Sequence, residues 1–347
     1  QVPPRHCIAI RITAENPEAG FQPTSGAVTE LNFRSAIDVW GYFSIDSSGS
    51  IHEFADSQFG HIFASGPDRE SARRAMLVAL KELTIRGDIR TTTEYIIKLM
   101  QSEDFTNNAI DTDWLDGRIA NHAKLAIEEG KLYGQPAELV AVCGAALQGY
   151  QHFEKRDQDY IQDLSVGQVP SIDNLKPVVN IDLIFHNIKY ASVVTQVSEG
   201  GVEVKCNGSA MLIQVRQQTC GGYLLNVAGK SHLAYSKVEP DGALRMTLDG
   251  NTCIFTPEYD PTRLASTVAG KLARQLVPDG SHLEKGMPYV EVEVMKMYMP
   301  LKTSEAGTVH FQISEGAALS PGDIIAKMEL DDPDRVVRAE LFSGKLL

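Results

Sequence analysis

Apolar positions along residues 1–165 follow the spacing first of strands and then of helices. Three short runs have the content and alternation of half-buried strands: residues 7–13, 39–44 and 61–65. The helical pattern after them has Asp68 as a candidate cap and Gly87 as a candidate end. Its apolar face comprises Ala72, Met76, Ala79, Leu80 and Leu83. We therefore expect a mixed α and β region at the start of the chain.

Two more helical patterns complete this region. Residues 91–94 read Thr-Thr-Thr-Glu, a capping box that predicts a helix start before Ile96, Ile97 and Met100. Residues 113–165 are also helical in pattern, with a break at residues 134–136. The stretch at residues 140–147 is small and apolar, so we interpret it as a packing face.

From residue 178 to residue 255 the pattern changes to short strand-like runs separated by turn signals. Asn207-Gly208 lies between two such runs, which is a strong hairpin signal. Further glycine-containing turns punctuate the rest, at residues 199–201, 241–242 and 249–250. Many short strands at this spacing predict a small antiparallel barrel. A polar linker with Pro261 follows at residues 258–263.

An internal repeat occupies residues 264–330. The first copy has Gly270, Gly280 and Gly286, and the second has three glycines at matching places: Gly307, Gly316 and Gly322. Their spacings are 10 and 6 residues in the first copy and 9 and 6 in the second. This predicts a pseudo-twofold β unit with glycine at the turns. The shared core is expected to contain Leu272, Val290, Val292, Val309, Ile325 and Met328.

Lys296 lies where the first copy ends, between Met295 and Met297. Pro300 follows, and it suits a strand edge or start but no central strand. We therefore expect Lys296 at the exposed tip of a hairpin between the two copies. Lysine has a flexible stem and an amine that can be acylated, and methionines adapt to several partners. The alternatives are an ordinary solvated lysine and a lipoyl-attachment site.

Composition narrows the classes of function. The chain has 347 residues, 43% of them hydrophobic, and a formal net charge of −13. This length suits two or three domains, and the charge argues against nucleic acid or an anionic membrane as partner. The most apolar run, residues 139–147, is too short to cross a bilayer. The five cysteines have no C-x-x-C pair, so we expect reduced thiols and no zinc site.

Glu293-Val294-Met295-Lys296-Met297 resembles the biotin-attachment motif of biotin carboxyl carrier domains, in the form found in eukaryotic multidomain acetyl-CoA carboxylases. Upstream segments resemble the C-terminal part of the biotin carboxylase domain of that family: residues 30–35, 39–44, 56–63 and 80–88. Residues 221–232 resemble its bridging barrel. One departure is Thr267-Val268-Ala269, where the family usually has prolines.

The resemblance implies a multidomain α+β and all-β chain. Residues 1–130 would be the mixed α/β C-terminal part of an ATP-grasp biotin carboxylase. Residues 131–257 would be a helical connector and a small antiparallel β-barrel, and residues 264–331 a flattened pseudo-twofold β-barrel or sandwich, the carrier. Residues 332–347 would begin a following segment. We expect the chain to be a piece of a larger polypeptide.

The implied function is that of a ligase, acetyl-CoA carboxylase. Biotin would be covalently bound to Lys296, beside Met295 and Met297. ATP and Mg or Mn would bind residues outside this chain, because we find no glycine-rich phosphate loop in it. No residue of the chain is expected to be catalytic or to bind a metal, and the chain alone is expected to be inactive.

The implied partners are a biotin protein ligase, the remainder of the biotin carboxylase domain and a carboxyltransferase domain. Acetyl-CoA and bicarbonate would be the substrates of the parent enzyme. The parent would be a homo-oligomer of the cytoplasm, or of a plastid, and would act in fatty acid synthesis. The alternatives are a non-catalytic carrier and docking protein, or part of a carboxylase for another acyl-CoA or for pyruvate.

Several residues of the carboxylase-like region are candidates for other roles. Arg34 could bind an anion, but we expect it to pair with Glu30. His61 is expected to be half-buried in a strand rather than a proton shuttle. The resemblance implies that a macrolide inhibitor binds near Glu30, Trp40, Phe63 and the position that Asp38 occupies. Asp38 departs from the family's asparagine there.

Overall fold

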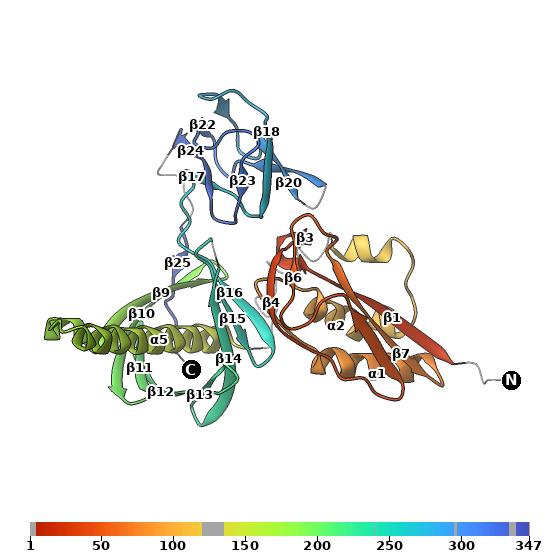
Figure 1. Cartoon of the computed structure of the whole chain (residues 1–347), viewed down its shortest axis with the longest axis horizontal. Helices are drawn as coiled ribbons and strands as arrows, with labels where there is room; N and C mark the ends of the chain where they lie inside the picture. The colour runs from red at the N-terminus through yellow and green to blue at the C-terminus, as the bar shows by residue number, and fades with distance from the viewer. Residues whose placement is uncertain (1–4, 120–134, 240, 295–296, 333–337, 347) are drawn as a thin grey trace. The chain divides into compact units, whose positions relative to one another are not determined.

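The computed structural model describes residues 5–119, 135–239, 241–294, 297–332 and 338–346 (Figure 1). The chain divides into two compact units, one formed by Gln1–His122 with Pro261–Pro333 and the other by Ala123–Asp260 with Asp334–Leu347. Three separate hydrophobic cores lie within them. We call the regions around these cores the amino-terminal part, the barrel part and the carrier part.

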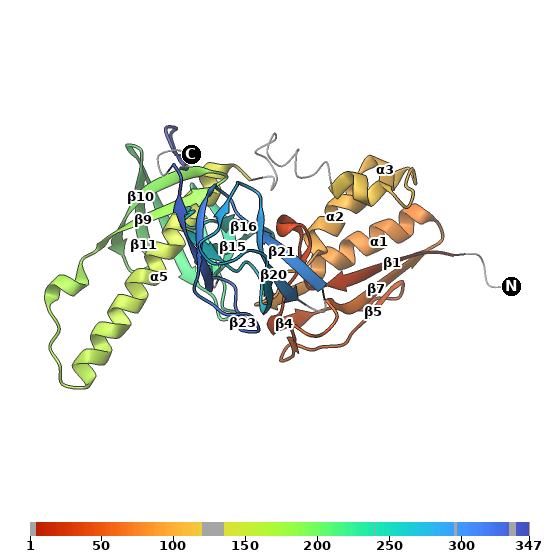
Figure 2. The ribbon, with the colours of Figure 1, turned by 90° about the horizontal axis from the view of Figure 1, so that it is seen from above.

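The amino-terminal part is built from small antiparallel sheets and several helices, and residues 114–119 are helical in addition to the elements named next. Its elements are β1 His6–Thr13, β2 Glu15–Asn16, a 3-10 turn Pro17–Ala19, β3 Gln22–Pro23, β4 Gly26–Asn32, β5 Val39–Phe43, β6 Ser50–Ile51, β7 Gln58–Gly66, α1 Arg69–Glu82, β8 Thr84–Gly87, α2 Thr93–Gln101 and α3 Glu103–Thr106. The strand orders are β1-β7-β5 and β6-β4-β8, and β2 pairs with β3. Helix α1 packs on β7 and β1 (Figure 2). The three predicted strands and both predicted helices are therefore confirmed.

Two helix ends differ from the prediction. Asp68 caps α1 as expected, because its carboxylate accepts the Ser71 amide at 2.7 Å. The helix ends at Glu82, however, and Gly87 lies in β8 against β4, where a Cβ would come within 2.2 Å of the Ala27 carbonyl oxygen. The capping box is wrong as well. The N-cap of α2 is Thr92, which makes no side-chain cap bond, since its hydroxyl lies 3.1 Å from that of Thr13.

The barrel part is one long sheet curved around a helix, and it is antiparallel except for its last strand, β25. Its elements are α5 Ala137–Ser165, a 3-10 turn Ile172–Leu175, β9 Val178–Phe185, β10 Ile188–Ser198, β11 Gly201–Cys206, β12 Ser209–Gln217, β13 Tyr223–Val227, β14 Lys230–Val238, β15 Leu244–Leu248, β16 Asn251–Phe255 and β25 Glu340–Leu341. The strands β9 to β16 pair in chain order. A bridge between Ile184 and Thr256 brings the last strand back to the first, so the sheet is nearly closed. The predicted barrel is confirmed.

The first half of α5 packs against β9 to β13 and contributes to the barrel's core (Figure 1). Every residue from Leu139 to Leu147 is buried, which explains the uniformly apolar pattern there. Two glycines allow the close approach: a Cβ at Gly144 would lie 2.6 Å from Phe255, and one at Gly149 would lie 2.5 Å from Val194. The helix was expected as a connector, but it fills the barrel.

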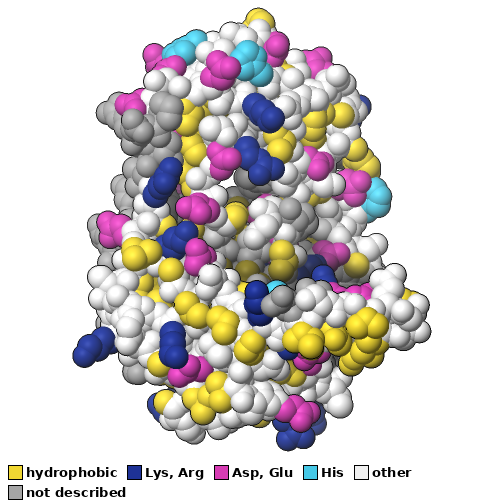
Figure 3. Space-filling view, turned by 90° about the vertical axis from the view of Figure 1, so that its left-hand side faces the viewer, with side chains coloured by type: hydrophobic (Ala, Val, Ile, Leu, Met, Phe, Trp, Pro, Cys, Tyr) yellow, Lys and Arg dark blue, Asp and Glu magenta, His cyan; other side chains and the backbone are white. Residues whose placement is uncertain are grey.

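The second half of α5 extends beyond the strands (Figure 2). Large apolar side chains on it and on the following loop are exposed: Ile161, Leu164, Val166, Val169 and Ile172. Figure 3 views the face toward which this helix extends, and hydrophobic side chains gather there in a band. No helix among the described residues is long and apolar enough to span a membrane.

The carrier part consists of two four-stranded antiparallel sheets. Its strands are β17 Arg263–Ala265, β18 Gly270–Gln275, β19 His282–Leu283, β20 Pro288–Val294, β21 Met297–Lys302, β22 Gly307–Phe311, β23 Ala318–Leu319 and β24 Ile324–Leu330. The sheet orders are β17-β24-β22-β19 and β21-β20-β18-β23. Strands β17 to β20 correspond in order to strands β21 to β24, and each strand occupies the same position in its sheet as its counterpart does in the other sheet. The predicted pseudo-twofold unit is therefore confirmed.

The paired glycines are equivalent, as the repeat predicted. A Cβ at Gly270 would lie 2.4 Å from the carbonyl oxygen of Glu293, and one at Gly307 would lie 2.2 Å from that of Glu329. Gly286 and Gly322 both have positive φ, +85° and +90°. All six predicted core side chains are buried. Since both halves contribute to that single core, neither half can bury its apolar face alone.

Candidate functional site

The hairpin of β20 and β21 holds the predicted attachment site. The two strands are antiparallel, and the last pair in their register is Val294 with Met297. Met295 and Lys296 lie outside the described residues. The flanking residues show how the hairpin is anchored, because Val294 is 2% exposed whereas Met297 is 49% exposed. The chain thus passes from a buried strand end to a solvent-facing strand start across this connection.

Strand β21 is the edge of its sheet, with β20 as its one neighbour in the strand order. Pro300 lies on this strand opposite Glu291, so its missing N–H costs no bond to a further strand. This confirms the expectation that Pro300 occupies an edge. Tyr298 is 61% exposed beside Met297. Tyr298 is not among the residues expected from the sequence, although its place next to the motif on an alternating strand is a usable signal.

An ion pair holds the side of β20 near the hairpin. The Arg274 guanidinium donates to both carboxylate oxygens of Glu291, at 2.7 and 3.1 Å. These bonds hold the pKa of Glu291 below its usual value. Buried Tyr289 anchors the start of the strand, and burial raises its pKa. The attachment hairpin therefore extends from a strand that is fixed on both faces.

The chain enters and leaves the carrier part at a place that the pseudo-twofold axis relates to the hairpin. Strands β17 and β24 pair there as β21 and β20 pair at the hairpin, with Arg263 opposite Lys327. The Met328 amide donates to the Thr262 carbonyl at 2.8 Å. The chain thus enters and leaves through one sheet of the carrier part, and the attachment hairpin lies at the matching place of the other sheet.

The candidate residues of the amino-terminal part have different partners from those expected. Glu30 pairs with Arg86, not with Arg34, because β4 and β8 lie side by side with Glu30 opposite Arg86. The expected Glu30–Arg34 pair is therefore wrong. Arg34 is exposed just after β4. Asp38 pairs with Arg5.

An aromatic stack lies on the sheet of β1, β7 and β5. The rings of Trp40 and Phe63 are stacked with centroids 5.5 Å apart, and His61 stacks on Phe63 at 6.1 Å. His61 is half-buried, as expected. Its side chain also contacts the Gln58 amide at 3.3 Å. Trp40 is 45% exposed, so the stack forms part of the surface and not of the core.

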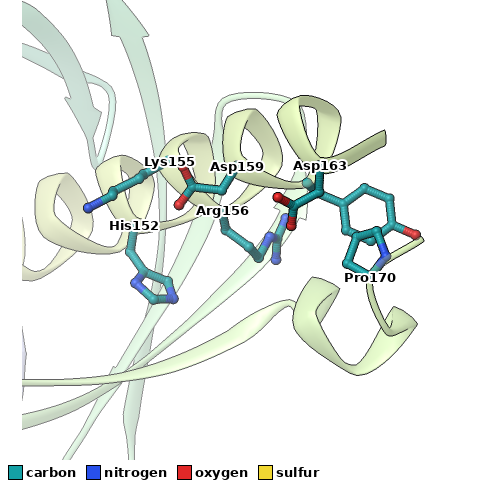
Figure 4. A pocket seen from close by; sticks show the side chains of 7 residues that line it. His152, Lys155, Arg156, Asp159, Asp163 and Pro170 are labelled. Atoms are coloured by element: carbon teal, nitrogen blue, oxygen red, sulfur yellow. The ribbon is translucent and has the colours of Figure 1, made fainter. Parts of the chain in front are cut away.

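A cavity of about 440 Å³ lies beside the outer half of α5 (Figure 4). Its lining combines the titratable side chains of His152, Lys155, Asp159 and Asp163 with Tyr160 and Pro170. Arg156 in the same wall binds the Lys176 carbonyl at 2.7 Å and the Gln196 side chain at 2.8 Å, so it fastens the returning loop. Among the described residues, no group of three or more His, Cys, Asp or Glu could hold a metal.

Comparison with known proteins identifies three consecutive domains. Residues 9–117 match the biotin carboxylase C-terminal domain, and residues 137–256 match the BT domain of acetyl-CoA carboxylase. Residues 262–328 match the family described as biotin-requiring enzyme. The order agrees with the amino-terminal, barrel and carrier parts of the structure.

Among the relatives, the acetyl-CoA carboxylase of Dictyostelium discoideum is 44% identical over 99% of this chain, and that of Saccharomyces cerevisiae is 45% identical over 99%. The chain spans 15% of the length of each. Among solved structures, the biotin carboxylase of Campylobacter jejuni is 33% identical over 32% of this chain and 24% of its own, with a TM-score of 0.31. From the three domain matches and the near-complete sequence coverage, we conclude that the chain belongs to the acetyl-CoA carboxylase family.

Proposed function

We propose that this chain is the carrier-bearing section of an acetyl-CoA carboxylase and that Lys296 carries its biotin. The observation that supports this best is the β20–β21 hairpin. Its described ends, buried Val294 and exposed Met297, lie on either side of Met295 and Lys296 at the junction of the two halves. An amine presented between such ends suits attachment by a second enzyme, a biotin protein ligase.

The described residues fit a covalently attached group of this kind. Met297 and Tyr298 offer an adaptable apolar and aromatic surface beside the attachment point. The Arg274–Glu291 pair and the buried strand β20 fix the base of the hairpin. When bound, biotin supplies a ureido nitrogen that can carry a carboxyl group between two active sites. The protein's part is to present that arm and to let it travel.

The proposed reaction has two half-reactions. ATP and bicarbonate carboxylate biotin at a biotin carboxylase site, of which residues 9–117 supply the C-terminal domain. A carboxyltransferase then passes the carboxyl group to acetyl-CoA and forms malonyl-CoA, the precursor for fatty acid synthesis. ATP and its Mg or Mn would be held by the remainder of the biotin carboxylase domain. The parent enzyme is proposed to be a homo-oligomer.

The compartment is proposed to be the cytoplasm, with a plastid as the alternative. One relative is named a mitochondrial acetyl-CoA carboxylase, so cell fractionation with an antibody to this chain is the deciding measurement.

The test of the attachment is the intact mass of the chain after co-expression with a biotin protein ligase and biotin. The mass of the unchanged chain is expected to rise by one biotinyl group, and that of Lys296→Arg is not. Lys302→Arg is a matched control on the same hairpin and is expected to be labelled normally. Labelling of the Lys296→Arg chain, or modification by lipoate in place of biotin, would refute the proposal.

A further inference from the structure

Both ends of the carrier part are fastened to the same hairpin of the barrel. On the outgoing side, the Thr256 amide donates to the Ile184 carbonyl at 3.0 Å. The Glu258 carboxylate then lies 3.5 Å from the Lys189 ammonium. Strands β9 and β10, which contain Ile184 and Lys189, form the hairpin. The chain therefore leaves the barrel along this hairpin.

The returning chain is fastened to the same place. Glu340 and Leu341 form β25, which adds to β10 as a parallel strand. The Glu340 amide donates to Asn187 at 3.0 Å, and the Phe342 amide donates to the Lys189 carbonyl at 2.9 Å. Lys189 thus contacts the outgoing chain through its side chain and the returning chain through its backbone.

Apolar side chains hold the returning segment more firmly than these few bonds. We call residues 340–346 the clasp. The Phe342 ring stacks on buried Tyr190 with centroids 4.7 Å apart, and Phe342 and Leu346 are 9% and 7% exposed within the barrel's core cluster. Asn207 donates to the Gly344 carbonyl at 2.7 Å. Burial of two large side chains stabilises a docked segment by several times the thermal energy.

The lengths of the two tethers limit the carrier's range. The outgoing tether runs from Glu258, which pairs with Lys189, to Thr262, whose carbonyl accepts the Met328 amide, so its four Cα-to-Cα steps reach roughly 14 Å when fully extended. The returning tether, residues 331–339, is nine residues long and reaches roughly 30 Å. Two tethers that start on one hairpin and end on one pair of strands also oppose free rotation of the domain between them.

We propose that the clasp is a fixed anchor that makes the carrier part a double-tethered insertion in the barrel part. The carrier tilts within reach of the shorter tether but does not turn freely about it. For biotin delivery, a consequence that rests on the proposed function, transfer between active sites farther apart than this reach requires the barrel to move together with the carrier. The chain that follows the carrier is then positioned by the barrel, and not by the carrier.

The experiment measures carrier motion in the full chain by ¹⁵N relaxation, with hydrogen exchange to report on the clasp. Phe342→Asp combined with Leu346→Asp places charges in the barrel core and should release the clasp. Protection of the Glu340 and Phe342 amides is expected to fall about tenfold or more. The rotational correlation time of the carrier amides is expected to shorten. Leu341→Asp is the matched control, because Leu341 is 67% exposed, and it should change neither quantity.

A chain that ends at residue 338 provides the second variant, since it removes the clasp without burying a charge. It should give the same faster carrier motion while the amides of β12 and β13 stay protected. If the carrier amides of the unchanged chain already tumble independently of the barrel, or if release of the clasp leaves their correlation time unaltered, the anchor has no such role. The readouts use no biotin, and they apply equally to Lys296→Arg, so this inference can fail while the proposed function stands.

Discussion

Substitution of Gly307 by alanine tests the close packing of strand β22 against strand β24 in the carrier part. An alanine Cβ at this position would lie 2.2 Å from the carbonyl oxygen of Glu329 and 3.0 Å from the Met328 side chain. Ordinary contact begins near 3.4 Å, so the strands must separate by about 1 Å or bend. The obstacle is backbone within a paired sheet, so no side-chain rotation relieves it.

The size of the effect follows from this geometry. Overpacking in a well-packed core costs typically ~1–3 kcal/mol, and a backbone obstacle places Gly307→Ala near the upper end. The pseudo-twofold equivalent, Gly270→Ala, meets the Glu293 oxygen at 2.4 Å and should cost nearly as much. Gly316→Ala is the control. Its φ of +86° strains an alanine, but the nearest atom is the end of the Lys271 side chain at 4.0 Å, so about 1 kcal/mol is expected.

Native-state hydrogen exchange of the full chain is the suitable assay, because it gives the opening free energy of the carrier strands without requiring two-state unfolding. The amides of β22 and β24 should lose about 3 kcal/mol of protection in Gly307→Ala, and those of the barrel part should be unchanged. Equal costs for Gly307→Ala and Gly316→Ala, or a cost below about 0.5 kcal/mol for Gly307→Ala, would refute the reasoning from close approach.

Three further outcomes are expected. The purified chain should show no bicarbonate-dependent ATP hydrolysis above a buffer control, and measurable hydrolysis would contradict the assignment of the ATP site to other residues. A thiol reagent at pH 8 should label exposed Cys7 and Cys220 in the native chain but not Cys143, because burial raises the pKa of that thiol to about 12; mass spectrometry after digestion reads the result. Hydrogen bonds from Arg73 and Arg74 lower the pKa of Glu70 from 4.5 to about 2. The stability that these bonds give to α1 should therefore be complete above about pH 4.5 and lost as the pH falls toward 2. Hydrogen exchange of the α1 amides in Glu70→Gln should lack this acid-dependent change.

The attachment motif and the repeat were readable from the sequence because both are local. Six core positions of the carrier part follow the period of strands, and the glycine spacing marks turns whose backbone only glycine adopts easily. The ion pair of Glu30 was misassigned for the opposite reason. The near residue Arg34 was chosen, whereas the partner is Arg86, which is distant in sequence and adjacent across a sheet.

The sequence by itself determined the kinds of elements, the barrel, the pseudo-twofold carrier and the residue proposed to carry biotin, since these depend on periodicity, turn residues and a short motif. Tertiary structure alone decided that α5 fills the barrel and that residues 340–346 return to it. A stripe of small apolar residues predicts that a helix face is buried, but it does not predict which other element covers that face. A two-residue strand such as β25 is too short to show any periodicity in the sequence. Its position is fixed by contacts with Lys189 and Tyr190, about 150 residues earlier in the chain, and such long-range contacts exist only once the barrel has formed.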